Sequence, residues 1–550
     1  MAVTPSGKLE LTWTNKHLRL LSNEDGGYTW VQPSDYRVAE VRLLHDLEEV
    51  GETHSARSRA KDNLLIRGDA LNALTSLCEL PEFAREYVGK VKLAYLDPPF
   101  NTQQAFAHYD DALEHSVWLT MMRDRLLQIR TLLAPEGSVW VHCDDSEQHR
   151  LRCVMDEILG PEQFVATVLW QKRYSRDNRP AIGAVHDFIH VYAPDPDAWK
   201  NARNRLARDA KTTKQYRNPN NDPRGPWRVI PLDAQGFRKN QMYDIVAPNG
   251  TVYRPPKGRC WGMLEGGFLE LAREGRIYWG KDGTARPGVI KYLSETDGLV
   301  PWTWWPNDEV GHNDEAKKEI LELFPEVEAF GTPKPERLMA RIVEVASNPD
   351  DVVLDCFAGS GTTAAVAQKM GRRWVTVEWS ADTVETFTRP RLEQVVAGAD
   401  LGGVTDQASW QGGGGFRVLE VAPSMFAEVD GRVWLADWAV DRELAEATAA
   451  QLGFDYEPEP PFAGRKGRTR LAVVDGLVSP DVVELLAGAL DSGEKLVLCG
   501  TAVDPAATDL LRELSKGSRT RKIPASILAE YRIAREWRAA AAAPEPASVA

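Results

Sequence analysis

The feature that most constrains this chain is an apolar stretch that runs into a glycine-rich turn and then a helix, at residues 351–370. Residues 351–363 read Asp-Val-Val-Leu-Asp-Cys-Phe-Ala-Gly-Ser-Gly-Thr-Thr. Gly359 and Gly361 have no Cβ, so their backbone can take unusual φ values and a ligand can approach it closely. A buried strand, a turn of this kind and a helix together open the ligand crevice of an α/β sheet.

The residues around the turn limit which ligand it can hold. A P-loop for ATP would need a lysine directly after the second glycine, and none follows Gly361 until Lys369. NAD fits better, because Gly359, Gly361 and Ala364 match the dinucleotide fingerprint. Glu378 then ends the next predicted strand, where its carboxylate suits the hydroxyls of a ribose. S-adenosylmethionine carries the same adenosine ribose, so the turn alone leaves both cofactors open.

A second motif, Asp97-Pro98-Pro99-Phe100, follows the apolar run 91–96. An exocyclic amine conjugated to a heteroaromatic ring is a poor nucleophile, so acceptors must hold its hydrogens as the nitrogen becomes tetrahedral. The Asp97 carboxylate and the Pro98 carbonyl are candidate acceptors, because consecutive prolines keep the chain extended and turn that carbonyl away from a sheet ladder. Phe100 offers a flat face for a base. The alternative is an ordinary turn after a strand.

The two motifs together predict methyl transfer from S-adenosylmethionine to the amine of a nucleic-acid base. Only this cofactor explains why one chain carries both a ribose-binding turn and an amine-activating motif. An NAD-linked oxidoreductase is the alternative from another class of enzyme.

The pair of motifs resembles the catalytic and cofactor motifs of amino-group DNA methyltransferases, which make N6-methyladenine or N4-methylcytosine. The catalytic motif comes first, and this order resembles the β-class, in which a target-recognition segment lies between the two halves. Residues 7–13 and 412–417 add a resemblance to the modification subunits of Type III restriction systems. Further matching stretches are 68–71, 137–142, 168–172, 186–192 and 332–338.

The resemblance implies a Rossmann-like S-adenosylmethionine-dependent methyltransferase fold. This fold is α/β, with a mainly parallel sheet, a circularly permuted motif order, an inserted target-recognition domain and a small C-terminal α/β module. Asp97, Pro98, Pro99 and Phe100 would then bind and activate the base. The implied cofactor residues are Asp69 at the adenine end, Lys334 at the start of a helix beside it, and Asp355, Phe357, Ala358, Gly359, Gly361, Thr362 and Glu378.

Two positions bear on which base is methylated. Cytosine-N4 enzymes of the family usually carry Ser before the prolines, so Asp97 favours adenine. Phe100 stands where adenine enzymes more often carry Tyr, which keeps N4-cytosine as the alternative.

Composition and periodicity divide the chain into six predicted parts. Strand-like runs alternate with helical stretches such as 117–133 and 147–159, which predicts a parallel sheet with helices on both faces. Gly412 to Gly415 are interpreted as a flexible linker. The parts are an N-terminal lobe (1–60), a catalytic half (61–194), a target-recognition domain (195–330), a cofactor half (331–410), a C-terminal docking or dimerisation module (411–538) and a disordered tail (539–550).

Positive charge is concentrated in one segment, although the whole chain has a net charge of −14. Between residues 171 and 228, thirteen Lys or Arg stand against six Asp. Local charge governs attraction to DNA more than the total does, and aromatic residues interleave with these cations. This favours DNA contact over a solvated loop. The predicted DNA-binding residues are Lys172, Arg173, Arg176, Arg179, Arg254 and Arg259.

Several site classes are not expected. The six cysteines are scattered and form no C-x-x-C pair, which argues against a disulfide framework and a zinc site. Residues 142–145 read His-Cys-Asp-Asp, but adjacent strand residues alternate sides and cannot converge on one metal ion. A loop that lines the base pocket is predicted there instead. No apolar run reaches the length of a membrane span and the N-terminus has no apolar signal core, so a cytoplasmic protein is expected.

The expected partner is double-stranded DNA, with the target adenine flipped out of the helix. The resemblance further implies a homodimer and a separate restriction subunit with ATPase and nuclease activity. Residues 416–530 contain no P-loop, helicase or nuclease constellation, which favours the docking or dimerisation role. Alternatively, the chain acts chiefly as the DNA-reading subunit of a larger defence complex.

Overall fold

The computed structural model describes residues 9–22, 28–33, 38, 41–101, 114–176, 181–208, 213–296, 298–328, 330–423, 426–429, 432–435, 442–459, 461–478 and 480–523. The chain divides into two compact units, 205–301 and the remainder. The predicted DNA contact Arg179 and the predicted tail 539–550 lie outside the described residues.

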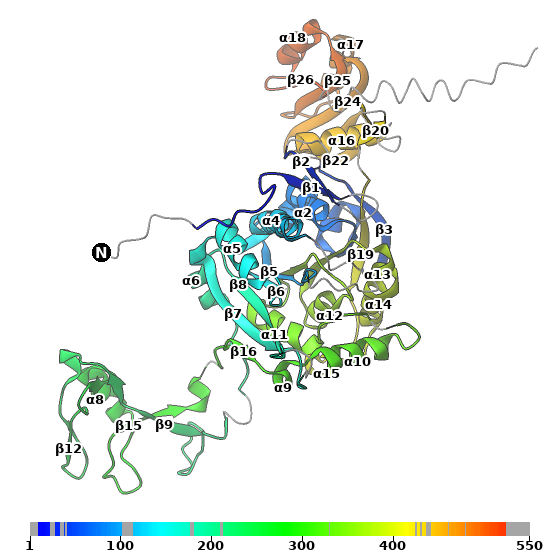
Figure 1. The fold of residues 1–550 in the computed structure, drawn as a ribbon. Helices are drawn as coiled ribbons and strands as arrows, with labels where there is room; N and C mark the ends of the chain where they lie inside the picture. The colour runs from blue at the N-terminus through cyan, green and yellow to red at the C-terminus, as the bar shows by residue number, and fades with distance from the viewer. Residues whose placement is uncertain are drawn as a thin grey trace, which may run out of the picture. The chain divides into compact units, whose positions relative to one another are not determined.

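The larger unit is organised around a ten-stranded sheet (Figure 1). Six of the nine pairs of neighbouring strands are parallel, which confirms the predicted mainly parallel α/β sheet. The strands, in spatial order, are β16 (Trp304–Trp305), β7 (Phe164–Gln171), β8 (His186–Tyr192), β6 (Leu133–Cys143), β5 (Val91–Leu96), β17 (Val352–Asp355), β18 (Arg373–Glu378), β4 (Asn63–Arg67), β19 (Gly415–Val421) and β3 (Leu44–Gly51).

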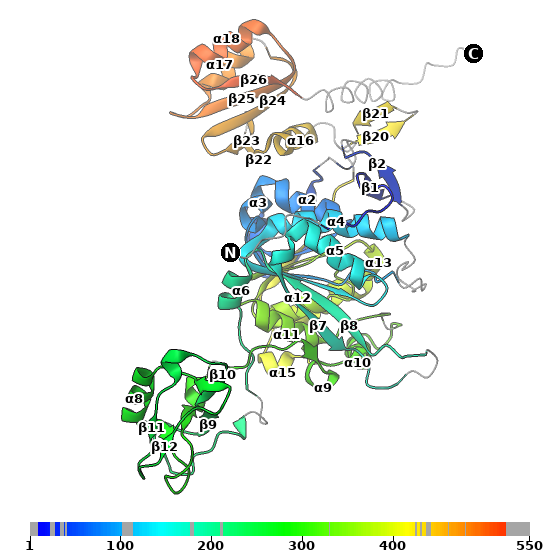
Figure 2. The ribbon, with the colours of Figure 1, turned by 60° about the vertical axis from the view of Figure 1, so that its left-hand side comes forward.

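Helices pack on this sheet in two groups, which lie on opposite sides of it in Figures 1 and 2. The first group is α2 (Ala70–Glu79), α3 (Pro81–Tyr87), α4 (His115–Leu132) and α5 (Gln148–Leu159). The second is α11 (Glu336–Ala346), α12 (Thr362–Lys369) and α14 (Arg389–Ala397). The expected helices 117–133 and 147–159 correspond to α4 and α5. Shorter helices of this unit are α6 (Pro196–Ala202), α9 (Asn307–Val310), α10 (Asn313–Leu323), α13 (Ala381–Thr383) and α15 (Thr405–Ala408).

Strands β5 and β17 are parallel neighbours at the centre of the sheet, although they come from the two halves of the chain. Ala94 and Leu354 are register partners. Because the carboxyl ends of parallel strands meet at one edge, the turn after β5 and the turn after β17 lie together at that edge. This arrangement brings the two sequence motifs to one place.

The prediction of a flexible linker at Gly412–Gly415 is wrong, because Gly415 begins a core strand. Strand β19 pairs in parallel with β4 and antiparallel with β3. A Cβ on Gly415 would lie 2.4 Å from the carbonyl oxygen of Val50. Glycine is therefore required here by a close backbone approach, and not by a need for mobility.

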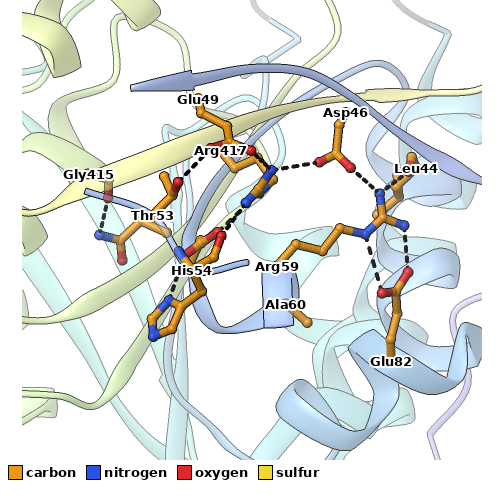
Figure 3. A network of polar contacts seen from close by, with 12 residues as sticks. Leu44, Asp46, Glu49, Thr53, His54, Arg59, Ala60, Glu82, Gly415 and Arg417 are labelled. Carbon is orange, nitrogen blue, oxygen red and sulfur yellow. Dashed lines mark hydrogen bonds and ion pairs between the residues drawn. The ribbon is translucent and has the colours of Figure 1, made fainter. Parts of the chain in front are cut away.

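A buried arginine fixes β19 to its neighbours (Figure 3). Arg417 is 1% exposed. Its guanidinium donates to Asp62 Oδ2 at 3.0 Å, to Glu49 Oε1 at 2.5 Å and to the carbonyl oxygen of His54 at 2.8 Å. A buried charge is tolerated only when it is paired and hydrogen-bonded in this way. The large sheet therefore extends beyond the predicted boundary at residue 411.

Two other predicted boundaries also differ from the structure. The predicted N-terminal lobe, 1–60, contributes β3 to the large sheet. The predicted target-recognition domain, 195–330, is wider than the compact unit 205–301. The difference arises because β16 pairs in parallel with β7, which ties the chain after residue 301 to the large sheet.

The smaller unit contains short strands around a core that includes Leu232, Ile245, Trp261 and Phe268. Its three-stranded sheet has the order β14 (Ile277–Tyr278), β15 (Gly288–Tyr292) and β9 (Trp227–Pro231). The other elements are β10 (Asp233–Gln235) paired with β13 (Arg259–Trp261), β11 (Ile245–Val246) paired with β12 (Val252–Tyr253), and α8 (Glu265–Arg273).

The C-terminal part contains a separate five-stranded sheet, a small α/β fold of the predicted kind. Its strands are β22 (Asp455–Glu459), β23 (Phe462–Lys466), β24 (Thr469–Val478), β25 (Lys495–Val503) and β26 (Arg519–Lys522), with α16 (Arg442–Leu452), α17 (Pro480–Gly488) and α18 (Pro505–Leu514). Two further strand pairs are β1 (Arg19–Ser22) with β2 (Tyr28–Val31), and β20 (Phe426–Val429) with β21 (Arg432–Leu435).

Within the described ranges, no helix is both long and apolar enough to cross a bilayer. The same residues contain no group of three or more His, Cys, Asp or Glu side chains arranged to hold a metal ion.

Candidate active site

A pocket lies where the chain leaves β5 and β17, and it is lined by both sequence motifs. The predicted residues that line it are Asp97, Pro98, Pro99, Phe100, Lys334, Asp355, Phe357, Ala358, Gly359, Thr362 and Glu378. Other lining residues include Tyr95, Phe330, Thr332, Met339, Thr363 and Trp379. The structure thus brings the DPPF motif and the glycine turn to one cavity.

The two carboxylate oxygens of Asp97 have different surroundings. Oδ2 forms an ion pair with Lys334 Nζ. Oδ1 is buried and has no hydrogen-bond partner among the described residues. A buried acceptor without a donor is costly, so such an atom points to a group that the pocket is built to receive. The side chain is therefore held on one side and open to a donor on the other.

The aromatic ring of Phe100 packs against His142, with ring centroids 5.4 Å apart and ring planes inclined by 31°. The Lys334 ammonium lies 5.1 Å from the centroid of the Phe100 ring. The carbonyl of the preceding Pro99 accepts a hydrogen bond of 2.7 Å from Trp118 Nε1. These contacts fix the orientation of the turn after β5.

His142 is itself held by a buried polar chain. Its Nδ1 lies 2.9 Å from the Tyr95 hydroxyl, and its Nε2 lies 3.3 Å from Asp187 Oδ2. Asp187 Oδ1 in turn accepts from Lys172 Nζ at 2.5 Å. Burial raises the pKa of the Tyr95 hydroxyl well above its ordinary value. This series of hydrogen-bonded side chains extends from Tyr95, which lines the pocket, to Lys172, directly after β7.

The glycine turn is shaped by two carboxylates that accept backbone hydrogen bonds. Asp355 Oδ1 accepts from the Phe357 N–H at 2.9 Å. Glu378 Oε2 accepts from the Gly359 N–H at 2.9 Å, and its Oε1 accepts from the Ser380 N–H at 3.0 Å. Gly359 has φ +50°, in the left-handed region that glycine adopts readily.

Gly361 does not line the pocket, but it completes the turn. Its φ is +77°, and it is the N-cap residue of α12. A Cβ at this position would lie 3.1 Å from Thr388 Cγ2. Glycine is thus required here for the start of the helix.

Burial changes the ionisation of the two carboxyls at this turn. Burial raises the pKa of Asp355 to about 7, even though hydrogen bonds from Thr363 and Phe357 act in the opposite direction. Burial also raises the pKa of Glu378 to about 6, against the backbone N–H groups of Ser380 and Gly359. Both groups therefore resist ionisation in a site that also contains Asp97.

Asp69 is not among the described residues that line the pocket. Its Oδ1 caps α2 by accepting from the N–H groups of Leu71 and Asn72, and its Oδ2 accepts from Arg125 Nη2 at 2.8 Å. The Arg125 guanidinium lies 5.8 Å from the Phe357 ring centroid. The contact of Asp69 with a cofactor stays a prediction.

The predicted DNA-binding cations are divided between the two compact units, with Arg254 and Arg259 in unit 205–301 and the other described ones in the larger unit. Lys172 is paired with Asp187, whereas Arg173 and Arg176 are exposed. Arg254 forms a two-pronged ion pair with Asp244, and Arg259 pairs with Asp233. Charge that already has a carboxylate partner is less available for phosphate or base contact. The DNA-binding role of each residue stays a prediction.

Sequence reasoning did not assign Tyr95 or Trp379, and it did not foresee the ion pair of Lys334 with Asp97. The cofactor contact of Lys334 stays a prediction. His142 belongs to the stretch 142–145, for which a loop lining the base pocket is predicted. The structure places it in β6, packed against Phe100. Trp379 follows Glu378 directly and is 60% exposed although it lines the pocket.

Comparison with known proteins agrees with this geometry. Residues 91–389 match a family described as DNA methylase, that of the N6 and N4 methyltransferases. The Mod subunit of the Type III restriction-modification enzyme StyLTI from Salmonella typhimurium is 30% identical over 397 residues, 62% of this chain and 58% of the relative. The probable HindVI Mod subunit from Haemophilus influenzae is 30% identical over 424 residues, 66% of this chain and 54% of the relative.

The alignments thus span a little more than half of these relatives. Among solved structures, PvuII DNA methyltransferase (cytosine-N4-specific) has a TM-score of 0.34 and 14% identity, covering 63% of this chain and 89% of that one. The family match includes both the strand before DPPF and the whole glycine turn. The chain belongs to the N6/N4 family of DNA methylases.

Proposed function

We propose that this protein transfers a methyl group from S-adenosylmethionine to the N6 amine of adenine in duplex DNA, as the modification component of a restriction-modification system. The observation that carries the proposal is the shared pocket. Asp97, with one buried and unpartnered oxygen, and the glycine turn after β17 both line it. An acceptor for amine hydrogens and a turn suited to a nucleoside are thereby joined in one cavity.

S-adenosylmethionine is the cofactor of the family, and the residues of this pocket fit it. Gly359 has no side chain, so a ligand can approach its backbone closely, and its φ of +50° is one that glycine adopts readily. Trp379 offers a large aromatic face, and Glu378 keeps acceptor capacity beyond its two backbone contacts. Phe357, Gly359, Glu378 and Trp379 would hold the adenosine part. When bound, the cofactor supplies an electrophilic methyl group.

Asp97 has the central role in activating the amine. Its Oδ1 accepts one amine hydrogen as the nitrogen becomes tetrahedral, and the Pro98 carbonyl is the proposed second acceptor. Lys334 holds Oδ2 and so fixes the direction of Oδ1. The amine loses one proton when its nitrogen is methylated, and this proton passes to Asp97 Oδ1, which then releases it to solvent. Much of the rate would then come from the positioning of two bound reactants.

Phe100 provides the stacking face for a base that has been flipped out of the duplex. His142 supports the ring, and its own orientation is fixed by Tyr95 and Asp187. A rigid aromatic wall reduces the freedom of the base and keeps its amine beside Asp97. His142 is therefore proposed as a positioning residue.

Adenine is preferred over cytosine as the substrate because Asp97 precedes the prolines. The two Type III Mod relatives support the same assignment at the level of the family. Phe100 is compatible with either base, since its ring stacks on both.

A homodimer and a separate restriction subunit are proposed as partners, on the strength of the Mod relatives. A second candidate function is DNA reading within a larger defence complex. The compact unit 205–301, which carries many cations and short strands, favours it. Purification together with an ATPase would support this function, and the two functions are compatible.

The test is methylation by the purified chain alone. DNA lacking base methylation would be incubated with S-adenosylmethionine, digested and examined for methylated nucleosides by mass spectrometry. N6-methyladenine that depends on Asp97 would support the proposal, whereas N4-methylcytosine would replace the base assignment. Thermal stabilisation by NAD but not by S-adenosylmethionine would contradict the proposed cofactor.

A further inference from the structure

The unit 205–301 contains another pocket, lined by residues of strands β9 and β15 and by Arg205, Arg208 and Tyr216. Its lining includes Arg205, Arg208, Tyr216, Arg228, Lys291 and Glu295. We call it the Tyr216 pocket. None of these residues belongs to the DPPF site. Arg205, Arg208 and Arg228 lie in the cation-rich segment 171–228 for which DNA contact is predicted, but the sequence does not single out a phosphate pocket there.

The Tyr216 pocket has an excess of positive charge. It is lined by four cations and one carboxylate, and Glu295 is already paired with Arg276 at 2.5 Å. Arg228 on β9 and Lys291 on β15 are register partners in an antiparallel pair. Like charges directly opposite one another destabilise a sheet. Neither cation forms an ion pair with an acidic residue in the described part of the chain.

The same pocket contains three buried polar atoms that have no hydrogen-bond partner in the described part of the chain. They are Arg208 Nε, Arg228 Nε and the Tyr216 hydroxyl. Tyr216 is only 6% exposed, and the guanidiniums of Arg208 and Arg228 lie 5.4 Å and 5.2 Å from its ring centroid. All three atoms can donate hydrogen bonds. Because burying a donor without an acceptor costs free energy, three such donors around one pocket that is rich in positive charge favour the binding of an acceptor there.

An oxyanion would account for both the excess positive charge and the unpartnered donors, because it is negatively charged and only accepts hydrogen bonds. Two guanidiniums and a hydroxyl suit the several oxygens of a phosphate group. We propose that the Tyr216 pocket binds one backbone phosphate of the DNA. This inference rests on the proposed function, because it takes the phosphate to belong to the methylated duplex.

A contact of this kind fixes the position of the DNA without reading its sequence. It therefore differs from the predicted contacts of Arg254 and Arg259. Those side chains are paired with Asp244 and Asp233, whereas the Tyr216 pocket holds donors without acceptors. Phosphate anchoring would hold unit 205–301 on any duplex, and base contacts elsewhere would supply the specificity.

The test is the salt dependence of DNA binding by the full chain. A fluorescent duplex of arbitrary sequence would be titrated by anisotropy at several salt concentrations, with wild type, Arg228→Gln and Arg228→Lys. We expect Arg228→Gln to weaken binding about tenfold. The slope of log affinity against log salt should fall by about 0.9, the value for one lost phosphate contact. Arg228→Lys should keep the slope.

Two further variants guard against indirect effects. Tyr216→Phe removes only the hydroxyl and should weaken binding about threefold with the slope unchanged. Arg224→Gln is the matched control, because Arg224 also lies over a tyrosine ring, at 4.6 Å from Tyr292, but is paired with Asp222. Equal loss of slope in Arg224→Gln and Arg228→Gln would overturn the inference. So would unchanged binding in both Arg228→Gln and Tyr216→Phe.

Inorganic phosphate separates the two sources of the ligand. If phosphate stabilises wild type but not Arg228→Gln against heat, and both bind DNA equally, the pocket serves a free phosphate compound and the DNA assignment is wrong. Methyl transfer is measured in parallel. Wild type that binds DNA with the expected slope but transfers no methyl group would contradict the proposed function and leave this inference standing.

Discussion

The two turns that meet at the active-site pocket are built in opposite ways. The turn after β5 is stiffened by Pro98 and Pro99, and it offers a carboxylate oxygen that no described residue hydrogen-bonds. In the turn after β17, glycines allow positive φ values, and the carboxylates already accept hydrogen bonds from backbone N–H groups. The first turn thus acts through a side chain that can accept a hydrogen bond, whereas the second acts through the shape of its backbone. Mutations in the first turn should therefore lower the rate of methyl transfer, and mutations in the second should lower the affinity for the cofactor.

The largest expected effect is on the turn after β5. Asp97→Ala removes the open acceptor, so methyl transfer should fall by about 10³-fold, the size of effect seen when one charge-stabilising group is lost. Affinity for S-adenosylmethionine should change by less than about twofold, because the glycine turn is intact. Single-turnover methylation and calorimetry would measure the two quantities.

Asp509→Ala is a suitable control for this variant, since Asp509 is a highly exposed carboxylate on α18. It should behave as wild type in both assays. If Asp97→Ala instead lost cofactor affinity and kept its single-turnover rate, the division of labour between the turns would be wrong.

The next largest effect is expected at Lys334, which forms an ion pair with Asp97. Lys334→Met releases Asp97 Oδ2, and the carboxylate loses its fixed direction. Misplacement of a catalytic group should lower the single-turnover rate by about tenfold to 10²-fold. Lys334→Arg should restore part of the rate. Loss of cofactor affinity with an unchanged rate would instead support the original assignment of Lys334 to the cofactor.

A smaller effect is expected from the turn after β17. In Gly359→Ala the added Cβ would lie 3.3 Å from the Phe330 ring and would occupy a φ of +50°. Affinity for S-adenosylmethionine should fall about tenfold, equivalent to about 1.4 kcal/mol, while the single-turnover rate at saturating cofactor is retained.

Gly371→Ala separates crowding in the pocket from backbone strain. Gly371 has φ +73°, but no atom lies within 4 Å of the position of its Cβ. Both variants should lose about 1 kcal/mol of stability, and only Gly359→Ala should lose cofactor affinity. A similar loss of affinity in both would attribute the effect to general destabilisation.

The comparison of the two turns also explains what could be predicted from sequence. Each turn has a local mechanical requirement, for consecutive prolines or for glycines, and such requirements are visible in a few adjacent residues. Their convergence followed from the rule that parallel strands end at one edge of the sheet. The central part of the fold and the main residues of the pocket were accessible for this reason.

The rest depends on contacts between residues far apart in the chain. The ion pair of Lys334 with Asp97 and the packing of His142 on Phe100 arise only when distant elements are in place. At Gly415 the local sequence suggested a flexible linker, but glycine also occurs where two backbone segments pack closely. The unit 205–301 has strands of only two to five residues, too short for a clear periodic pattern.

The smallest effect distinguishes the two neighbouring carboxyls by their response to pH. Burial raises the pKa of Asp355 to about 7 in the folded protein, against an ordinary value of 3.8. Its folded-state pKa is raised, so its contribution to stability is fully present below about pH 4 and is lost as the pH rises toward 7. Within this window the slope is at most about 1.4 kcal/mol per pH unit for one proton.

Asp355→Asn keeps the acceptor for the Phe357 N–H but cannot ionise. The free energy of unfolding, measured in urea at pH 5, 6 and 7, should therefore decline less steeply in this variant than in wild type. A residual slope is expected from Glu378, whose pKa burial raises to about 6. Parallel curves for the two proteins would mean that Asp355 ionises as readily in the fold as in the unfolded chain. The turn after β17 would then carry a full negative charge beside Asp97, and its purely structural role would have to be abandoned.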